Sequence, residues 1–213
     1  MKIQAFVLGA VGTNCYFVTN EVTKQTIIID PPEQAGRIRE KLEDKGLAPV
    51  AILLTHGHFD HIMAASDLSE DYGIPVYAPE AEKALLEAPR LNLSESMGSS
   101  FAITPDIFLH DMEQLTIAGF PVRVLLTPGH TAGSVCYHFY EDNVLVSGDT
   151  LFFESVGRTD LPSGNMEHLL ESIRTKLMCL EDSVKVYPGH GPRTTIGHER
   201  KNNPFLGRES FWD

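Results

Sequence analysis

The sequence predicts a single α/β domain built from layers of helix and sheet. Short apolar runs typical of buried strands alternate with segments whose apolar residues recur at helical spacing. The chain has 213 residues, within the range of about 200–250 that one domain can reach. Hydrophobic residues make up 42% and charged residues 22%, a balance that excludes a coiled coil, a fibre or a disordered tail. We therefore expect one domain over residues 1–213.

The first part of the chain is expected to alternate strands with a helix. Its apolar, β-branched runs predict four strands, which are Ile3–Leu8, Cys15–Thr19, Gln25–Ile29 and Val50–Leu54. The third strand should stop before Pro31, because proline cannot donate a hydrogen bond to a sheet. Ala35, Ile38 and Leu42 then recur at helical spacing, and Gly46 lies where a C-terminal cap belongs.

The rest of the chain continues the alternation. Helical spacing predicts three further helices, over residues 60–71, 80–87 and 166–180. Five more strands are expected, namely Gln114–Ile117, Val122–Leu126, Val135–Tyr140, Val144–Ser147 and Val184–Tyr187. The stretch 88–104 contains proline, glycine and several serines, which predicts a mobile loop.

Charge and cysteine content restrict the class of function. Seventeen basic and 29 acidic residues give a net charge of −12, so we expect neither nucleic acid nor an anionic membrane as a partner. The three cysteines show no paired spacing, which favours a reducing compartment. No run reaches the roughly 18 apolar residues of a membrane span, and the N-terminus lacks a signal-peptide pattern. A cytoplasmic location is the resulting expectation.

One short loop concentrates metal-ligand side chains. Residues 55–61 read Thr-His-Gly-His-Phe-Asp-His and follow a predicted buried strand. His56 and His58 are two residues apart, so in extended backbone they point to the same side. Asp60 and His61 would lie on the first turn of a helix. Imidazole and carboxylate bind zinc, iron or manganese, and four such ligands in one loop favour two neighbouring metals.

Three other loops carry further ligand-type side chains beside a glycine. They are Thr127-Pro128-Gly129-His130, Ser147-Gly148-Asp149 and Tyr187-Pro188-Gly189-His190, and each follows a predicted strand. The carboxyl ends of strands are where α/β sheets place their sites. Any one of these loops alone would be weak evidence, but together with residues 55–61 they indicate a metal site.

These motifs resemble those of the metallo-β-lactamase fold superfamily, and more closely those of glyoxalase II-like hydrolases. The resemblance rests on the loops above together with Gly157-Arg158-Thr159-Asp160, and it extends from about Asn14 to Pro204. It implies an αββα four-layer sandwich of two mixed sheets with helices on the outer faces. By position it assigns one metal to His56, His58 and His130, a second to Asp60, His61 and His190, and a bridging role to Asp149.

The resemblance also implies an activity. A binuclear-metal-dependent hydrolase of this type uses a metal-bridging hydroxide as nucleophile, with Asp60 orienting or deprotonating the water. A thiolate can leave without a strong general acid, which favours thioesters such as S-lactoylglutathione over amides. The expected cofactors are two divalent ions, with zinc first and iron or manganese as alternatives. The expected partner is a small-molecule thioester, and the expected state is a monomer or small homo-oligomer.

Two more residues receive roles from the resemblance. Asp30 lies where the family places an acid that supports a metal-binding histidine, and we favour this role over that of a simple turn aspartate before Pro31. Arg158 matches a basic residue that contacts a glutathione carboxylate, and an ion pair with Asp160 is an equal alternative. The chain departs from two-domain glyoxalase II in the short stretch after His190, where we expect no helical C-terminal domain. Gly191 and Pro192 stand where the family has a tyrosine.

Three alternative functions remain open at this point. A mono-iron persulfide dioxygenase-like oxidoreductase on the same fold would use His56, His130 and Asp149. A nuclease of the superfamily would need a cap domain and a basic face, and a non-catalytic metal protein would need no substrate. The histidines outside the ligand loops, which are His110, His138, His168 and His198, are expected at the surface or in packing. Cys15, Cys136 and Cys179 are expected to be small buried hydrophobes.

Overall fold

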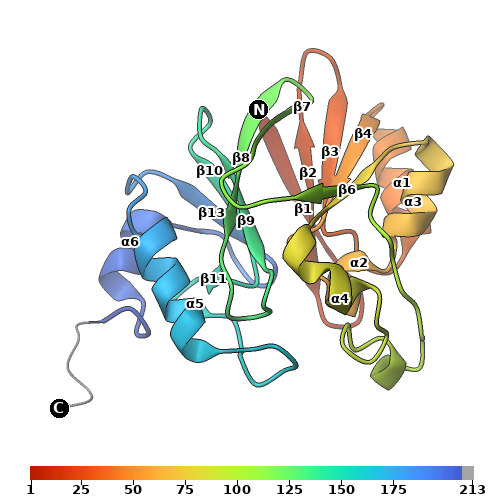
Figure 1. Cartoon of the computed structure of the whole chain (residues 1–213). Coiled ribbons are helices and arrows are strands. Elements are labelled where there is room, and N and C mark those ends of the chain that lie inside the picture. Colours follow the sequence, from red (N-terminus) through yellow and green to blue (C-terminus); the bar gives the residue numbers. More distant parts are fainter. Residues whose placement is uncertain (208–213) are drawn as a thin grey trace.

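A computed structural model describes residues 1–207, and two six-stranded mixed sheets face each other in it (Figure 1). The first sheet comes from the N-terminal half, in the order β1-β2-β3-β4-β5-β6. Its strands are β1 (Lys2–Leu8), β2 (Thr13–Thr19), β3 (Gln25–Ile29), β4 (Ala48–Leu53), β5 (Val76–Pro79) and β6 (Ile107–Leu109). β1, β2 and β3 pair antiparallel, whereas β3, β4, β5 and β6 pair parallel.

The second sheet comes from the C-terminal half, in the order β14-β13-β10-β9-β8-β7. Its strands are β7 (Gln114–Ile117), β8 (Phe120–Leu126), β9 (Val135–Phe139), β10 (Val144–Gly148), β13 (Lys185–Pro188) and β14 (Thr194–Thr195). A small hairpin of β11 (Leu151–Phe152) and β12 (Ser155–Val156) forms a separate pair. β8 and β10 both pair antiparallel with β9, and β10 pairs parallel with β13, so β8, β10 and β13 run in one direction.

Helices cover the outer faces of both sheets. The first sheet is covered by α1 (Ala35–Asp44) and α3 (Ala65–Tyr72), and the second by α5 (Met166–Ser172) and α6 (Ile196–Asn202) (Figure 1). The remaining helical segments are short, and they are α2 (Phe59–Ile62), η1 (Glu80–Glu82), α4 (Lys83–Leu86), η2 (Glu95–Met97) and η3 (Ile173–Leu177). No helix within residues 1–207 is long and apolar enough to cross a membrane.

Alternation along the strands separates the core into layers. In β3, Ile27 and Ile29 point between the sheets, while Ile28 packs under the outer helices with Ile38 of α1. Behind the second sheet, a third cluster joins Leu145 to α5, η3 and α6. All three isoleucines are fully buried, as a strand covered on both faces requires. The four-layer αββα sandwich implied by the resemblance is therefore confirmed.

Three predicted helices differ from the structure. The helix expected over 60–71 is interrupted at Ala64, whose N–H donates to the Pro31 carbonyl at 3.2 Å instead of to the preceding turn. The helix expected over 80–87 begins as the 3₁₀ turn η1. The helix over 166–180 ends in the π-helix η3, where Met178 N–H donates to the Ile173 carbonyl, and Cys179 just beyond it is exposed rather than buried.

Several short elements were absent from the sequence-based prediction. They are β5, β6, β11, β12, β14 and α6, and the four shortest of the strands have two or three residues. Periodicity cannot identify a strand of that length, because it depends on repeated alternation. The loop predicted over 88–104 is irregular apart from η2, and it is tied down by Asn92, which is buried and donates to the Phe101 carbonyl.

Candidate metal centre

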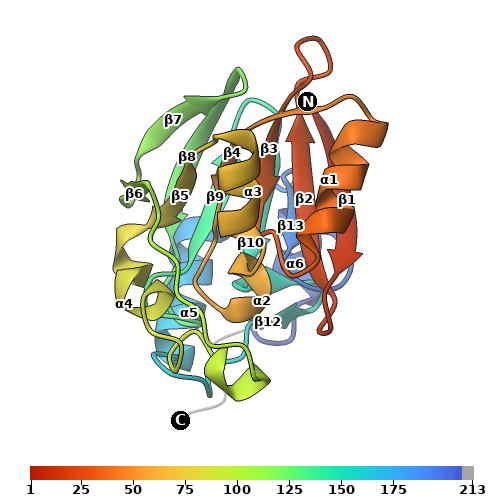
Figure 2. The same cartoon turned by 90° about the vertical axis from the view of Figure 1, so that its right-hand side faces the viewer.

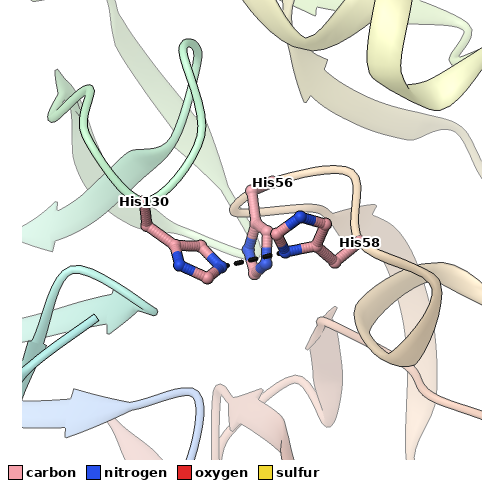
Figure 3. A group of neighbouring side chains, drawn as sticks. All are labelled: His56, His58 and His130. Atoms are coloured by element: carbon pink, nitrogen blue, oxygen red, sulfur yellow. Dashed lines mark hydrogen bonds between the residues drawn. The ribbon is translucent and has the colours of Figure 1, made fainter. Parts of the chain in front are cut away.

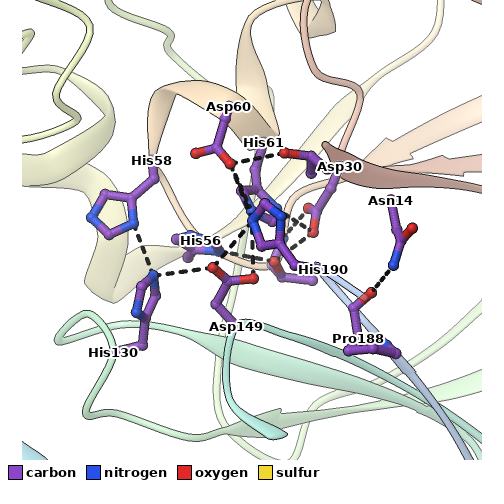
Figure 4. Close-up of polar contacts among 12 residues, drawn as sticks. Asn14, Asp30, His56, His58, Asp60, His61, His130, Asp149, Pro188 and His190 are labelled. Atoms are coloured by element: carbon purple, nitrogen blue, oxygen red, sulfur yellow. Dashed lines mark hydrogen bonds and ion pairs between the residues drawn. The ribbon is translucent and has the colours of Figure 1, made fainter. Parts of the chain in front are cut away.

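The side chains singled out by the sequence meet at one edge of the sandwich, between the two sheets. Each follows the carboxyl end of a strand: Asp30 follows β3, the 55–61 loop follows β4, and the other three loops follow β8, β10 and β13. The parallel orientation within each sheet brings these strand ends to one side (Figure 4). All seven proposed ligands and Asp30 therefore lie in one cluster, although they span 160 positions of sequence.

One group contains three histidines from two loops. His56 and His58 come from the β4 loop and His130 from the β8 loop, and their rings converge (Figure 3). His58 Nδ1 lies 2.9 Å from His130 Nε2. The three donor nitrogens lie within 4.8 Å of one another, which is compatible with ligands of one ion.

A second group contains Asp60, His61 and His190, and Asp149 lies between the two groups. His61 Nε2 is 3.5 Å from Asp60 Oδ2 and 3.5 Å from Asp149 Oδ1. Asp149 Oδ2 is 3.5 Å from His130 Nε2 and 3.6 Å from His190 Nε2 (Figure 4). One carboxylate thus faces donors of both groups, as the proposed bridging role requires.

Unpaired polar atoms show that this cluster fits a cation. Among the described residues, the buried side-chain atoms of the centre that lack a hydrogen-bond partner are His56 Nε2, His58 Nε2, His61 Nε2 and Asp149 Oδ1. Leaving such atoms unpaired costs about 1–3 kcal/mol each. A divalent ion would remove that cost for the donors that face it, and the nitrogen and oxygen donor set suits zinc, iron or manganese.

Hydrogen bonds at the far side of each ring fix which nitrogen faces the cluster. His130 donates Nδ1–H to the Arg158 carbonyl at 2.8 Å, and His61 donates Nδ1–H to Asp30 Oδ2 at 2.9 Å. His56 Nδ1 lies 3.1 Å from Thr55 Oγ1, which itself donates to Asp30. In each case Nε2 is the nitrogen that faces the other donors of the cluster, which is how metal-binding histidines are usually held.

Asp30 is the anchor of this network. It is buried, and it accepts hydrogen bonds from Thr55 N–H at 2.7 Å, from the Thr55 hydroxyl at 2.6 Å and from His61. Its φ of +50° is a conformation that aspartate tolerates better than most residues. The interpretation as a support for a metal-binding histidine therefore has a structural basis, because Asp30 contacts His61 directly and His56 through Thr55.

Gly189 leaves no room for a side chain beside the centre. A Cβ at this position would lie 2.1 Å from Asp149 Oδ1 and 2.7 Å from His61 Cε1. Gly189→Ala is therefore expected to displace both ligands and weaken metal binding by about tenfold or more. Competition with a chromophoric chelator measures this change.

The matched control is Gly36→Ala in α1, where a Cβ would meet nothing within 4 Å. It should bind metal like the parent chain and be slightly more stable, since alanine favours a helix over glycine by about 1 kcal/mol. Equal metal affinity in both variants would contradict the idea that a side chain at position 189 displaces Asp149 and His61.

The electrostatics of the two groups differ. Burial, followed by the neighbouring histidines, lowers the pKa of His58 to about 3, so its ring is neutral at pH 7. Burial would also lower the pKa of His61, but the charges of Asp60, Asp149 and Asp30 raise it to about 10. Burial opposes ionisation of Asp60, yet His61 and the hydrogen bonds from His190 and Thr13 hold its pKa below the usual value. Asp60 is therefore ionised.

This difference predicts a proton release on metal binding. An ion bound at His61 Nε2 must displace the proton that His61 holds up to a pKa of about 10. Affinity for that equivalent should therefore rise about tenfold per pH unit between about pH 7 and pH 9, whereas His56 and His58, whose pKa values are lowered by burial, have no proton to release in this range. Calorimetry in two buffers with different ionisation heats counts the protons. No proton release in this range would contradict the assignment of His61.

Arg158 contacts the centre only through its backbone carbonyl, which accepts from His130, while its side chain is exposed to solvent. Its guanidinium donates to both carboxylate oxygens of Asp160 at 2.7 Å, and both side chains are more than 60% exposed. The ion pair considered as an alternative is thus present. Because the pair is exposed it contributes little to stability, and a contact of Arg158 with a substrate carboxylate stays a prediction.

Some residues of the centre were missed by sequence reasoning. Thr13 is buried and donates to Asp60 Oδ2 at 2.8 Å. Asn14 donates to the Pro188 carbonyl (Figure 4) and to the Gly191 carbonyl, which flank His190. Tyr16 donates to the same Pro188 carbonyl at 2.6 Å. These contacts fasten β2 of the first sheet to β13 of the second. The only sequence signal was a polar Thr-Asn pair at the start of a strand.

The fold and the centre together define a metallo-hydrolase of the four-layer sandwich class. The chain belongs to the metallo-beta-lactamase superfamily, and the sequence model of that family matches residues 8–198. It is 40% identical over 208 residues to "Probable metallo-hydrolase YqgX" of Bacillus subtilis (strain 168), covering 97% of this chain and 98% of the relative. It is 38% identical over 213 residues to "Hydroxyacylglutathione hydrolase GloC" of Haemophilus influenzae (strain ATCC 51907 / DSM 11121 / KW20 / Rd), covering 99% and 100%.

Solved structures agree with this assignment. The BLEG-1 B3 metallo-beta-lactamase superposes with a TM-score of 0.92 at 42% identity, covering 96% of this chain and 99% of the other. TTHA1623 in a di-iron-bound form gives 0.85 at 35% identity, covering 95% and 100%. ETHE1 from Myxococcus xanthus gives 0.79 at 28% identity, covering 96% and 84%. The chain is therefore similar over nearly its whole length to proteins that are described by different activities or metals.

Proposed function

We propose that this chain is a binuclear-metal-dependent thioester hydrolase of the hydroxyacylglutathione hydrolase type. The observation that carries the proposal is the pair of donor groups joined by Asp149, since a mononuclear centre would need only one of them. The full-length similarity to a hydroxyacylglutathione hydrolase supports the substrate class. The proposed substrate is a small-molecule thioester such as S-lactoylglutathione.

Seven residues would hold the two ions. One ion would be held by His56, His58 and His130 and the other by Asp60, His61 and His190, with Asp149 shared. Two divalent ions, zinc first, would supply a water of lowered pKa and a positive charge to polarise the thioester carbonyl. No serine or cysteine nucleophile is then needed.

Asp60 is the proposed catalytic carboxylate of the chain itself. It is ionised, and Thr13 holds its Oδ2 by a 2.8 Å hydrogen bond while His190 Nε2 lies 3.3 Å from the same oxygen. A carboxylate fixed in this way can orient a water molecule and accept its proton. Asp149 and His190 are less buried than His56 and His61, so a substrate would approach the centre from their side.

The leaving group favours a thioester. A thiol with a pKa of about 8.5 leaves as the thiolate without help from a strong acid, whereas an amide nitrogen must be protonated. In the metal-loaded centre the ligand loops would offer no strong acid, because Asp60 is ionised, His58 is neutral and His61 would bind metal through the nitrogen that otherwise holds its extra proton. Arg158 is the proposed contact for a carboxylate of the thiol carrier, reached when its exposed pair with Asp160 opens.

Chelation and reconstitution test the proposal. Chelated protein is expected to lose S-lactoylglutathione hydrolysis by at least about a hundredfold, because the chemistry depends on the ions, and to regain it with two equivalents of zinc. Iron and manganese are added in parallel reconstitutions, and metal is quantified in each sample. A panel of thioesters and a β-lactam is assayed with every reconstituted form. Full metal loading without thioester hydrolysis would overturn the substrate assignment, and hydrolysis of the β-lactam alone would replace it.

A mono-iron persulfide dioxygenase-like oxidoreductase is the second candidate. The similarity to ETHE1 favours it, and His56, His130 and Asp149 would serve as its ligands. The presence of Asp60, His61 and His190 as a complete second group favours the hydrolase. One equivalent of iron, together with oxygen consumption on a persulfide, would reverse the choice.

A further inference from the structure

Glu82 is a buried carboxylate that the proposed chemistry does not use. It ends the 3₁₀ turn η1 just before α4, and its residue is only 1% exposed. No lysine, arginine or histidine forms an ion pair with it within residues 1–207. Burying an unpaired carboxylate is costly, so the chain must satisfy it by other means.

Backbone N–H groups from two different metal-ligand loops satisfy this carboxylate. Glu82 Oε2 accepts from Gly57 N–H at 2.8 Å, and Gly57 stands between His56 and His58. Glu82 Oε1 accepts from Gly133 N–H at 2.8 Å, in the loop that carries His130. One side chain therefore links the two loops that supply the three-histidine group, through one oxygen for each loop.

Packing around the same turn holds both loops against it. A Cβ at Gly57 would lie 2.6 Å from Leu85 Cδ2, and a Cβ at Gly133 would lie 2.5 Å from the Ala81 carbonyl carbon. Both glycines thus lie directly on the η1–α4 segment, which is at the same end of the molecule as α2 (Figure 2). Larger residues at either glycine would push its loop away from the carboxylate.

The contacts of Glu82 stop short of the second group. Asp60 and His61 are on α2, and the His190 loop is fastened instead by Asn14 and Tyr16 of β2. Glu82 therefore contacts only the loops of the three-histidine group, Asn14 and Tyr16 contact the His190 loop, and Asp30 reaches both groups through His61 and Thr55. A change at Glu82 should act on one group more than on the other.

We propose that Glu82 is a positioning residue that sets the spacing between the β4 and β8 loops and so assembles the His56, His58 and His130 group for one of the two ions. The proposal rests on the metal centre of the proposed function, but not on its substrate. A carboxylate is required because each oxygen accepts one N–H, whereas a glutamine has only one accepting oxygen. Aspartate is one methylene shorter and cannot reach both loops from the same backbone position.

The test is a zinc titration of the parent chain, Glu82→Gln and Glu82→Asp against a chromophoric competitor. The parent is expected to bind two equivalents. In both variants one equivalent should weaken by about 10–100-fold, the size of effect that supporting contacts have on metal affinity, while the other changes by less than about threefold. A role limited to overall stability would weaken both equivalents equally or neither, and that result would overturn the proposal.

Two controls separate the outcomes. Glu80→Gln changes an exposed glutamate of the same turn, and it should leave both equivalents unchanged. Asn14→Ala is the reciprocal variant and should weaken the equivalent that Glu82→Gln spares.

If the parent chain binds no zinc, the proposed function fails. If it binds two equivalents and Glu82→Gln matches Glu80→Gln, only the role of Glu82 fails. Should Glu82→Gln not fold, Glu82→Asp keeps the charge and provides the same test.

Discussion

Asp149→Asn is expected to disrupt both metal equivalents and lower hydrolysis by about a hundredfold or more. Asp149 faces donors of both groups, with His61 Nε2 and His130 Nε2 each 3.5 Å from its oxygens. In asparagine an N–H₂ replaces one of the two oxygens, so the side chain could bind only one of the two metal ions. Loss of a supporting contact already costs 10–100-fold in metal affinity, and loss of a shared ligand should cost more.

Metal quantification after dialysis, followed by thioester turnover, measures this effect. Asp44→Asn at the end of α1 is the matched control, because this aspartate is exposed and lies outside every ligand loop. It should retain two equivalents and full activity. If Asp149→Asn also retained two tightly bound equivalents, the bridging assignment would be wrong.

The second large effect is expected for Asp30→Asn. The amide can still accept from Thr55 N–H, but its N–H₂ would face the His61 Nδ1–H that Asp30 now accepts. A metal-bound His61 would carry its single proton on Nδ1, and without an acceptor there the form with the proton on Nε2, the nitrogen that faces the second group, would be favoured. A protonated nitrogen cannot bind a metal, so we expect a loss of about 10–100-fold in affinity. The altered buried hydrogen bonds should also cost about 1–3 kcal/mol of stability.

Thr55→Val is the partner variant for this experiment. It removes the hydroxyl that links His56 to Asp30 but leaves the direct bond from His61 to Asp30 in place. Zinc titration should therefore show a weaker effect confined to the equivalent bound by His56. The idea that Asp30 sets the ring orientation would be refuted if Asp30→Asn folded normally and bound both equivalents with unchanged affinity.

Local patterns in the chain were sufficient to predict most of the sheet framework. The strands Gln25–Ile29 and Gln114–Ile117 have the predicted bounds, since each is an apolar run enclosed by turn residues. The helix predicted over 60–71 failed for a tertiary reason, because the Ala64 N–H bonds to Pro31 in a distant loop. Two-residue strands such as Thr194–Thr195 could not be predicted, because their only signal is pairing with β13.

The candidate ligands were accessible to sequence analysis because each follows the end of a strand and stands close to a glycine. The residues that hold those ligands were much less accessible. Glu82 precedes a short helix with nothing in its neighbourhood to mark it, and its two partners are the backbone N–H groups of Gly57 and Gly133. Backbone partners leave no pattern in a sequence, so only the folded chain shows them.

The sequence by itself determined the superfamily and the layered α/β class, and it singled out the seven candidate donor side chains, because these depend on residue type and short-range spacing. Only the tertiary structure decided which donors face one another, that Asp149 lies between the two groups, and that Asp30 and Glu82 support them. The physical reason is that parallel strands from two sheets must end at one edge before these loops can meet. The loops are far apart in the sequence, so strand pairing and burial of the core, rather than local spacing, bring them together.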